Sequence, residues 1–133
     1  DTGVISVIKY VAAQDSGRII NPRMALNQVE GAISQMLGFA LWEELVTDPS
    51  TGITLNASYL QHKVPTILDY PDIRVIFADV VDPVGPLGAK GLGEVPCPGV
   101  APAIANAVYD AIGVRLNELP MNPAKVLRAL DSR

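Results

Sequence analysis

The chain of 133 residues is long enough for one hydrophobic core, and 49% apolar against 18% charged residues excludes a disordered protein. A net charge of -4 without any basic cluster argues against a nucleic-acid partner. One cysteine excludes an internal disulfide, and no apolar run approaches the roughly 20 residues of a membrane span, so we expect a cytoplasmic location. Because Asp1 leads directly into an extended pattern, we expect residues 1–133 to be a single domain that is a fragment or split subunit of a larger protein.

The first half of the chain predicts a strand and a long helix. Val4 to Val11 is almost continuous in β-branched and aromatic residues, which predicts a strand buried on both faces or nearly so. Asn21 and Pro22 are typical of the cap and first residue of a helix, which we expect to run to about Glu44. Apolar residues at three- and four-residue spacing form its predicted buried face: Val29, Ile33, Met36, Leu37, Ala40 and Leu41.

A second stripe on this helix combines two amides with two glycines. Gln28, Gly31, Gln35 and Gly38 fall on one side of the helix because of their spacing. A glycine inside a helix costs about 1 kcal/mol relative to alanine, so two of them indicate a close neighbour. Tight helix packing and a polar ligand both remain possible readings of this stripe.

The second half predicts a strand and two helices. Residues 53–60 are expected to be extended, and residues 73–79 have the composition of a strand. A helix is predicted from about residue 99 to residue 112, ended by Gly113 in the left-handed conformation, and a short one over residues 123–130. The pattern predicts an α+β fold with helices packed on a mixed β-sheet.

The segment Gly85–Cys97 is the stretch most suited to chemistry. It contains four glycines, which favour turns or a close approach of the backbone to a ligand, and one carboxylate, Glu94. Burial would raise the pKa of such a carboxyl group and make it a plausible general base, whereas an exposed glutamate in a turn would have no such role. Lys90 could bind a phosphate, but the sequence is neither a Walker A motif nor a complete dinucleotide fingerprint, so a solvated lysine is the alternative.

Other candidate residues carry weaker signals. His62 is the single histidine and has no acid or nucleophile nearby, so we interpret it as structural. Cys97 lies between two prolines and is read as a small apolar residue. No cluster of histidine, cysteine and carboxylate has metal-ligand spacing, so we predict no metal held by protein side chains.

Three ordered motifs resemble the molybdenum hydroxylases, the xanthine dehydrogenase / aldehyde oxidase family. They are Asp15-Ser-Gly-Arg-Ile-Ile-Asn-Pro22, Gln28-Val-Glu-Gly-Ala32 running on to Glu44, and Gly88-Ala-Lys-Gly-Leu-Gly-Glu94 with the helix after it. The resemblance covers nearly the whole chain and identifies it as similar to the C-terminal part of the molybdopterin-binding subunit.

The resemblance implies a molybdopterin cofactor, possibly as the cytosine dinucleotide, whose pterin dithiolene holds the metal. It implies that Glu94 is the base that deprotonates the molybdenum-bound hydroxyl for attack on an aldehyde or an N-heterocycle, with water as the oxygen source. Gln28 would hydrogen-bond the pterin, Gly91 and Gly93 would leave room for the cofactor, and Lys90 would join them as a cofactor-binding residue. Fe–S clusters and FAD are expected on other domains or subunits.

Two rival functions remain at this stage. The chain could be a non-catalytic structural or interaction domain with the same fold, or an anion- or nucleotide-binding module that uses the glycine loop and Lys90. If the chain is instead part of a molybdenum hydroxylase, most of the molybdopterin pocket would come from sequence outside it, so we expect the isolated chain to be inactive.

Overall fold

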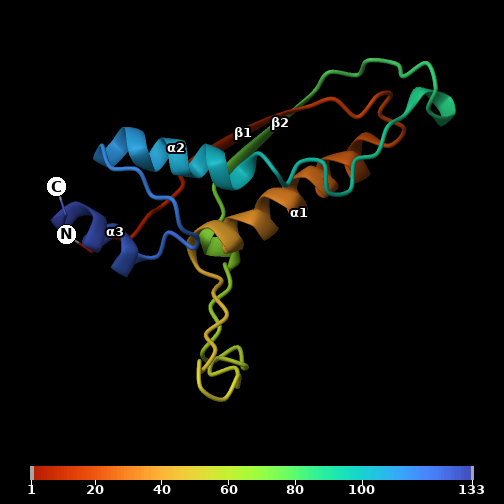
Figure 1. The fold of residues 1–133 in the computed structure, drawn as a ribbon. Helices are drawn as coiled ribbons and strands as arrows, with labels where there is room; N and C mark the ends of the chain where they lie inside the picture. The colour runs from red at the N-terminus through yellow and green to blue at the C-terminus, as the bar shows by residue number, and fades with distance from the viewer. Residues whose placement is uncertain (1, 133) are drawn as a thin grey trace.

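The computed structural model describes residues 2–132 and confirms the α+β fold class (Figure 1). The elements in chain order are β1 (Lys9–Gln14), α1 (Pro22–Leu41), β2 (Asp72–Phe77), α2 (Val100–Ile112) and α3 (Pro123–Asp131). β1 and β2 pair in parallel, with Lys9 opposite Asp72 and Gln14 opposite Phe77. α1 and α2 lie on one side of this strand pair and enclose the core with it.

The N-terminal strand is shorter and less buried than predicted. It begins at Lys9 rather than Val4, and exposed residues alternate with half-buried ones along it. Tyr10 and Ala12 pack against the core, whereas the side chains of Ile8 and Val11 are 84% and 53% exposed. The prediction of burial on both faces is wrong for this chain, because residues 2–132 cover only one face of the strand pair.

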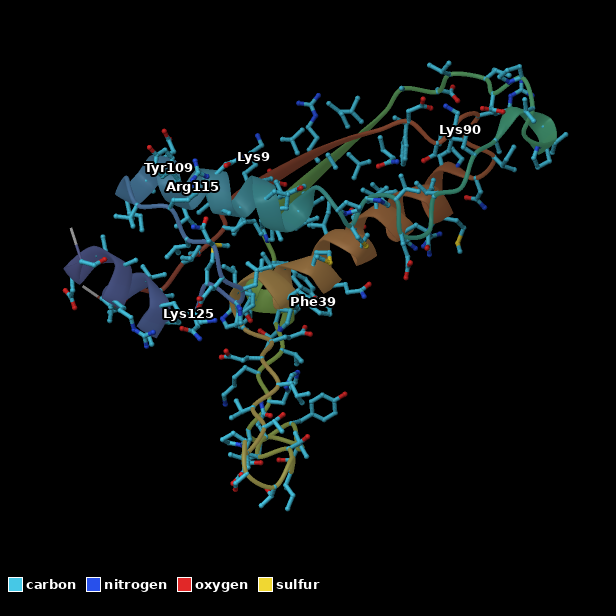
Figure 2. The ribbon with its side chains drawn as sticks, in the orientation of Figure 1. Lys9, Phe39, Lys90, Tyr109, Arg115 and Lys125 are labelled. Carbon is cyan, nitrogen blue, oxygen red and sulfur yellow. The ribbon has the colours of Figure 1, made fainter. Side chains whose placement is uncertain are left out.

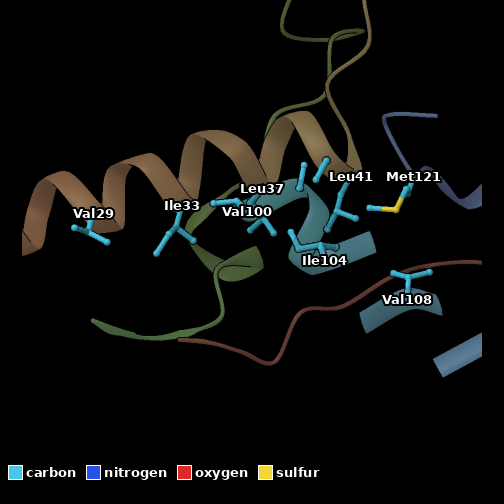
Figure 3. Packing of buried hydrophobic residues seen from close by; sticks show 10 residues of the cluster. Val29, Ile33, Leu37, Leu41, Val100, Ile104, Val108 and Met121 are labelled. Carbon is cyan, nitrogen blue, oxygen red and sulfur yellow. The ribbon is translucent and has the colours of Figure 1, made fainter. Parts of the chain in front are cut away.

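The core is formed where α1 crosses α2 (Figure 3). Ile33 and Leu37 of α1 are almost completely buried, as are Val100 and Ile104 of α2. The predicted buried face of α1 is confirmed, except that Met36 is only half-buried at its border. The three- and four-residue spacing therefore identified the side of α1 that contacts α2.

α1 ends at Leu41, three residues earlier than predicted. The backbone N–H groups of Trp42 and Glu43 both donate to the carbonyl of Gly38, at 2.9 and 2.8 Å, which stops the helical ladder. Gly38 is buried, and a Cβ there would collide with the Glu43 carboxylate and approach Pro65. This glycine therefore makes room for the chain's own turn, and not for a ligand.

Residues 43–66 form an arm that projects from the end of α1 (Figure 1, yellow to green). Thr47 and Thr54 make an isolated antiparallel bridge on either side of the turn at residues 48–53. The Asn56 side chain ties the two sides together with hydrogen bonds of 2.9 and 2.6 Å to backbone groups across the arm. The prediction of an extended segment over residues 53–60 is wrong, because turns dominate there.

α2 and α3 have the expected ends. Gly113 follows α2 with φ 70° and donates its N–H to the Tyr109 carbonyl at 2.7 Å, as predicted for a left-handed cap. The Asn122 side chain caps α3 by accepting from the Lys125 N–H at 3.0 Å, and Pro123 is the first helical residue. Within residues 2–132, no helix has both the length and the apolar character that a membrane crossing requires.

Candidate functional site

The glycine loop docks on the turn that follows β1. The N–H of Arg18 donates to the Gly88 carbonyl at 2.7 Å, and the N–H of Lys90 donates to the Ser16 carbonyl at 2.9 Å. The two segments meet beside the N-terminal end of α1 (Figure 1). The Asp-Ser-Gly-Arg motif and the glycine motif are thus parts of one structure, although they are far apart in sequence.

Gly17 makes this docking possible. Its φ of 65° lies in the left-handed region that side chains disfavour. A Cβ at this position would lie 2.9 Å from the Lys90 nitrogen and 3.0 Å from the Ala89 carbonyl carbon. Both the backbone conformation and the close approach of the loop therefore require glycine.

Gly17→Ala is expected to destabilise the protein more than Gly52→Ala. Gly52 has a similar φ of 73° but nothing within 4 Å of its Cβ position, so alanine there costs only the left-handed conformation, about 1–2 kcal/mol. At Gly17 the overlap with the loop adds about 1–3 kcal/mol. Urea unfolding of both variants measures the difference, and equal losses of unfolding free energy would refute the steric argument.

An ion pair reinforces the docked loop. Asp15 Oδ2 accepts from Lys90 Nζ at 2.7 Å, and Asp15 Oδ1 accepts from the Gly17 N–H at 3.0 Å (Lys90 is labelled in Figure 2). The Lys90 hydrogen bond, and then the Gly17 N–H, hold the pKa of Asp15 below its ordinary value, while the Asp15 carboxylate raises the pKa of Lys90.

These two pKa shifts define the pH range in which the Asp15–Lys90 ion pair is intact. Because the pKa of Asp15 is lowered, its stabilising contribution is complete above its ordinary value and is lost as the pH falls through the lowered one. Because the pKa of Lys90 is raised, its contribution is complete below its ordinary value and is lost as the pH rises through the raised one. The pair therefore persists throughout the neutral range.

A second aspartate shapes the loop from inside. Asp82 Oδ1 accepts from the N–H groups of Val84 and Gly85 at 2.8 and 2.6 Å, and its own N–H donates to the Gly88 carbonyl at 2.9 Å. The Gly85 bond, followed by the Val84 bond, lowers the pKa of Asp82. The loop therefore has a defined turn structure before it reaches the docking contacts.

A cavity of about 220 Å³ beside the first turns of α1 brings Gln28 and Lys90 together. Arg18, Leu92 and Ser16 also line it. Ser16 is 2% exposed, and its hydroxyl has no hydrogen-bond partner within residues 2–132. The cavity therefore combines apolar walls with an amide and an unsatisfied hydroxyl.

The other predicted site residues lie outside this cavity. Gly91 and Gly93 are exposed, and apart from their immediate chain neighbours no residue within 2–132 comes within 4 Å of their Cβ positions. Glu94 is exposed in the turn before α2, where its carbonyl accepts from the Cys97 N–H at 3.0 Å. Of the two alternatives for Glu94, burial or an exposed turn, residues 2–132 show the exposed turn.

Sequence reasoning missed the partners of the loop. Asp15 and Gly17 were recognisable as turn residues, but their spacing carries no sign that they contact Lys90 and Ala89. His62, half-buried in the arm, lies apart from the docked loop and the cavity beside α1. Cys97 is half-buried at the end of the glycine segment, outside that cavity, and its N–H donates to the Glu94 carbonyl. No group of three or more histidine, cysteine or acidic side chains in residues 2–132 is placed to hold a metal ion.

The chain is similar in sequence to known molybdenum enzymes. Residues 1–71 match the family described as the molybdopterin cofactor-binding domain. The chain is 42% identical over 130 residues to the molybdenum-binding subunit of an aldehyde oxidoreductase from Escherichia coli, covering 97% of this chain and 18% of that protein. It is 38% identical over 122 residues to the molybdenum-binding subunit of a xanthine dehydrogenase from Escherichia coli, covering 92% of this chain and 16% of that protein.

Solved structures of molybdenum hydroxylases share the fold of this chain. Quinoline 2-oxidoreductase from Pseudomonas putida matches with a TM-score of 0.92 and 30% identity over 99% of this chain and 17% of that one. Aldehyde oxidoreductase from Desulfovibrio gigas matches with a TM-score of 0.88 and 32% identity over 98% of this chain and 14% of that one. The chain thus spans less than one fifth of the length of these relatives. It belongs to the molybdopterin cofactor-binding domain family and is related to the molybdenum-binding subunits of the xanthine dehydrogenase and aldehyde oxidoreductase enzymes.

Proposed function

We propose that this chain is part of the molybdopterin site of a molybdenum hydroxylase that oxidises an aldehyde or an N-heterocycle with water as the oxygen source. One observation carries the proposal: the loop that bears Glu94 is docked beside the cavity that contains Gln28. The relatives support it, because their names include an aldehyde oxidoreductase, a xanthine dehydrogenase and a quinoline oxidoreductase. The chain would act as one domain within a larger, cytoplasmic assembly.

The residues at the cavity fit a pterin. The Gln28 amide can both donate and accept a hydrogen bond, which suits the mixed donor and acceptor edge of a pterin ring. The unpartnered Ser16 hydroxyl adds a second polar group. Outside the cavity, Gly91 and Gly93 leave the outer face of the loop open to a close ligand. Molybdopterin, in the plain or cytosine dinucleotide form, would supply a two-electron redox centre when bound.

Glu94 is the proposed general base. One of its Oε atoms would accept the proton of the water-derived hydroxyl group that attacks the substrate carbon. The turn that ends in the Cys97–Glu94 hydrogen bond leaves the carboxylate pointing away from the core, where the rest of the subunit can enclose it. Enclosure would exclude water and strengthen the base, so the isolated chain should not turn over.

Uncovered apolar side chains support an assembly. Leu68, Val84 and Ile8 are 92%, 91% and 84% exposed in this chain. We propose that the remaining molybdopterin-subunit sequence covers them, and that Fe–S and FAD domains or subunits receive the electrons. A non-catalytic domain with the same fold would carry neither molybdenum nor pterin, so analysis of both in the purified assembly separates the two functions.

Gln28→Ala is expected to reduce the molybdopterin affinity of the assembly by about tenfold, the effect of one lost hydrogen bond to a buried ligand. Gln35→Ala provides the matched control, since Gln35 is exposed on the same helix and lies outside the cavity. Pterin and molybdenum contents after dialysis measure the difference. Equal retention by the two variants would contradict the proposed role of Gln28.

A further inference from the structure

We propose that Asp15 and Lys90 are a positioning pair for Glu94, whose ion pair fixes the upstream end of the segment that carries this carboxylate. The inference rests on the proposed function of Glu94. Nothing in the family match assigns a role to Asp15. The contacts of Lys90 also give its ammonium group a different task from direct cofactor binding.

Glu94 lies on a short span that is held at both ends. Upstream, Lys90 is bound twice, by its N–H to the Ser16 carbonyl at 2.9 Å and by Nζ to Asp15 at 2.7 Å. Downstream, Pro96 is buried and Val100 is completely inaccessible at the start of α2. The position of the carboxylate is therefore set by these two anchors.

Between the two anchors, Leu92 packs against the core and is flanked by two glycines. Gly91 and Gly93 contribute flexible backbone, and no described atom packs where their side chains would be. Glu94 itself is exposed and makes no side-chain hydrogen bond within residues 2–132. Loss of the Lys90–Asp15 ion pair would leave Leu92 and the Lys90 backbone to hold the span before Glu94, so the carboxylate would be less precisely placed.

Asp15 couples the loop to the body of the protein. One carboxylate oxygen accepts a hydrogen bond from the Gly17 N–H in the turn after β1, and the other accepts one from Lys90 Nζ. Asp82, the other carboxylate that acts on Lys90, uses its side chain for the Val84 and Gly85 N–H groups. Asp15 is thus the direct partner of Lys90. Asp82 could replace it only by losing its hydrogen bonds to the Val84 and Gly85 N–H groups.

The test uses Asp15→Ala, Asp15→Asn, Lys90→Met and Lys90→Arg in the assembled enzyme, with benzaldehyde and quinoline as probe substrates. Asp15→Ala and Lys90→Met should lower kcat by about 10- to 100-fold, the effect of a small misplacement of a reacting group. KM should stay within about twofold, because substrate binding is not changed. Molybdenum content should be unchanged, Lys90→Arg should retain most activity, and the double variant should be no worse than either single one.

Amide hydrogen exchange gives a readout that does not depend on turnover. Exchange over residues 88–94 should become about tenfold faster in Asp15→Ala, with the core of α1 and α2 unaffected. Asp15→Asn keeps an acceptor for the Gly17 N–H but loses the charge, so it separates the ion pair from folding of the turn. Glu44→Gln, which removes the distant 3.5 Å ion pair with Lys125, is the control and should change neither kcat nor exchange in the loop.

The outcomes separate this inference from the proposed function. Full activity of Asp15→Ala beside an inactive Glu94→Gln would overturn the positioning role alone. Loss of molybdenum in Lys90→Met would also overturn it, in favour of direct cofactor binding. Full turnover by Glu94→Gln would overturn the proposed function and this inference together.

Discussion

Replacing Glu94 with glutamine is expected to abolish hydroxylation by the assembled enzyme while its molybdenum content stays the same. Glutamine has nearly the same shape but cannot accept a proton, so the attacking oxygen loses its base. Loss of a general base costs about 100- to 10,000-fold in rate. Because Glu94 lies on the outside of the docked loop and supports no packing in residues 2–132, the substitution should not disturb the fold. Steady-state rates and metal analysis of the same preparation provide the measurement.

Glu118→Gln is the matched control for this experiment. Glu118 is also exposed and loop-borne, but it lies after α2 beside a different cavity, lined among others by Arg115 and Arg128. Its substitution makes the same change in net charge and should leave kcat unaltered. Substantial turnover by Glu94→Gln, or an equal loss in Glu118→Gln, would exclude Glu94 as the base.

Leu37→Ala is expected to lower the free energy of unfolding by about 2–5 kcal/mol. Leu37 is 1% exposed in the contact between α1 and α2, so truncation removes buried methyl groups and leaves a cavity that the two helices cannot close without moving (Figure 3). Urea unfolding monitored by circular dichroism measures the loss as a shift of the midpoint.

Phe39→Ala tests whether burial, and not helix propensity, determines that loss. Phe39 lies two residues further along α1 and is 48% exposed, so its truncation should cost about 1 kcal/mol or less in this chain. If the two variants lose equal stability, the contact between α1 and α2 does not hold the domain together as the structure indicates.

Much of the fold could be predicted because its signals are local. Asn21 and Pro22 begin α1, Gly113 ends α2, and the spacing of apolar residues marks the buried side of α1. Caps, turns and periodicity depend on residues within a few positions of one another, so a sequence displays them directly. The order of three motifs likewise sufficed to recognise the family.

Signals that depend on neighbours distant in sequence were misread. The apolar run before Gln14 has the pattern of a strand covered on both faces, yet this chain covers only one of them. The glycine stripe on α1 left tight packing and a ligand open as alternatives, and the structure places Glu43 and Pro65 of the same chain beside Gly38. Gly31 on the same stripe is exposed and has no such neighbour among residues 2–132, so glycine composition alone does not locate a close contact.

For this member of the molybdopterin cofactor-binding domain family, the sequence by itself determined the helices, their caps and the family, and it marked Glu94 as the candidate base. Only the tertiary structure decided that Asp15 binds Lys90, that Gly17 admits the loop, and that Gln28 shares a cavity with Lys90. The physical reason is the separation in sequence between the interacting residues. A hydrogen bond within a turn is specified by residues a few positions apart. A contact between the end of β1 and the loop before α2 exists only once packing of the core has brought the two together.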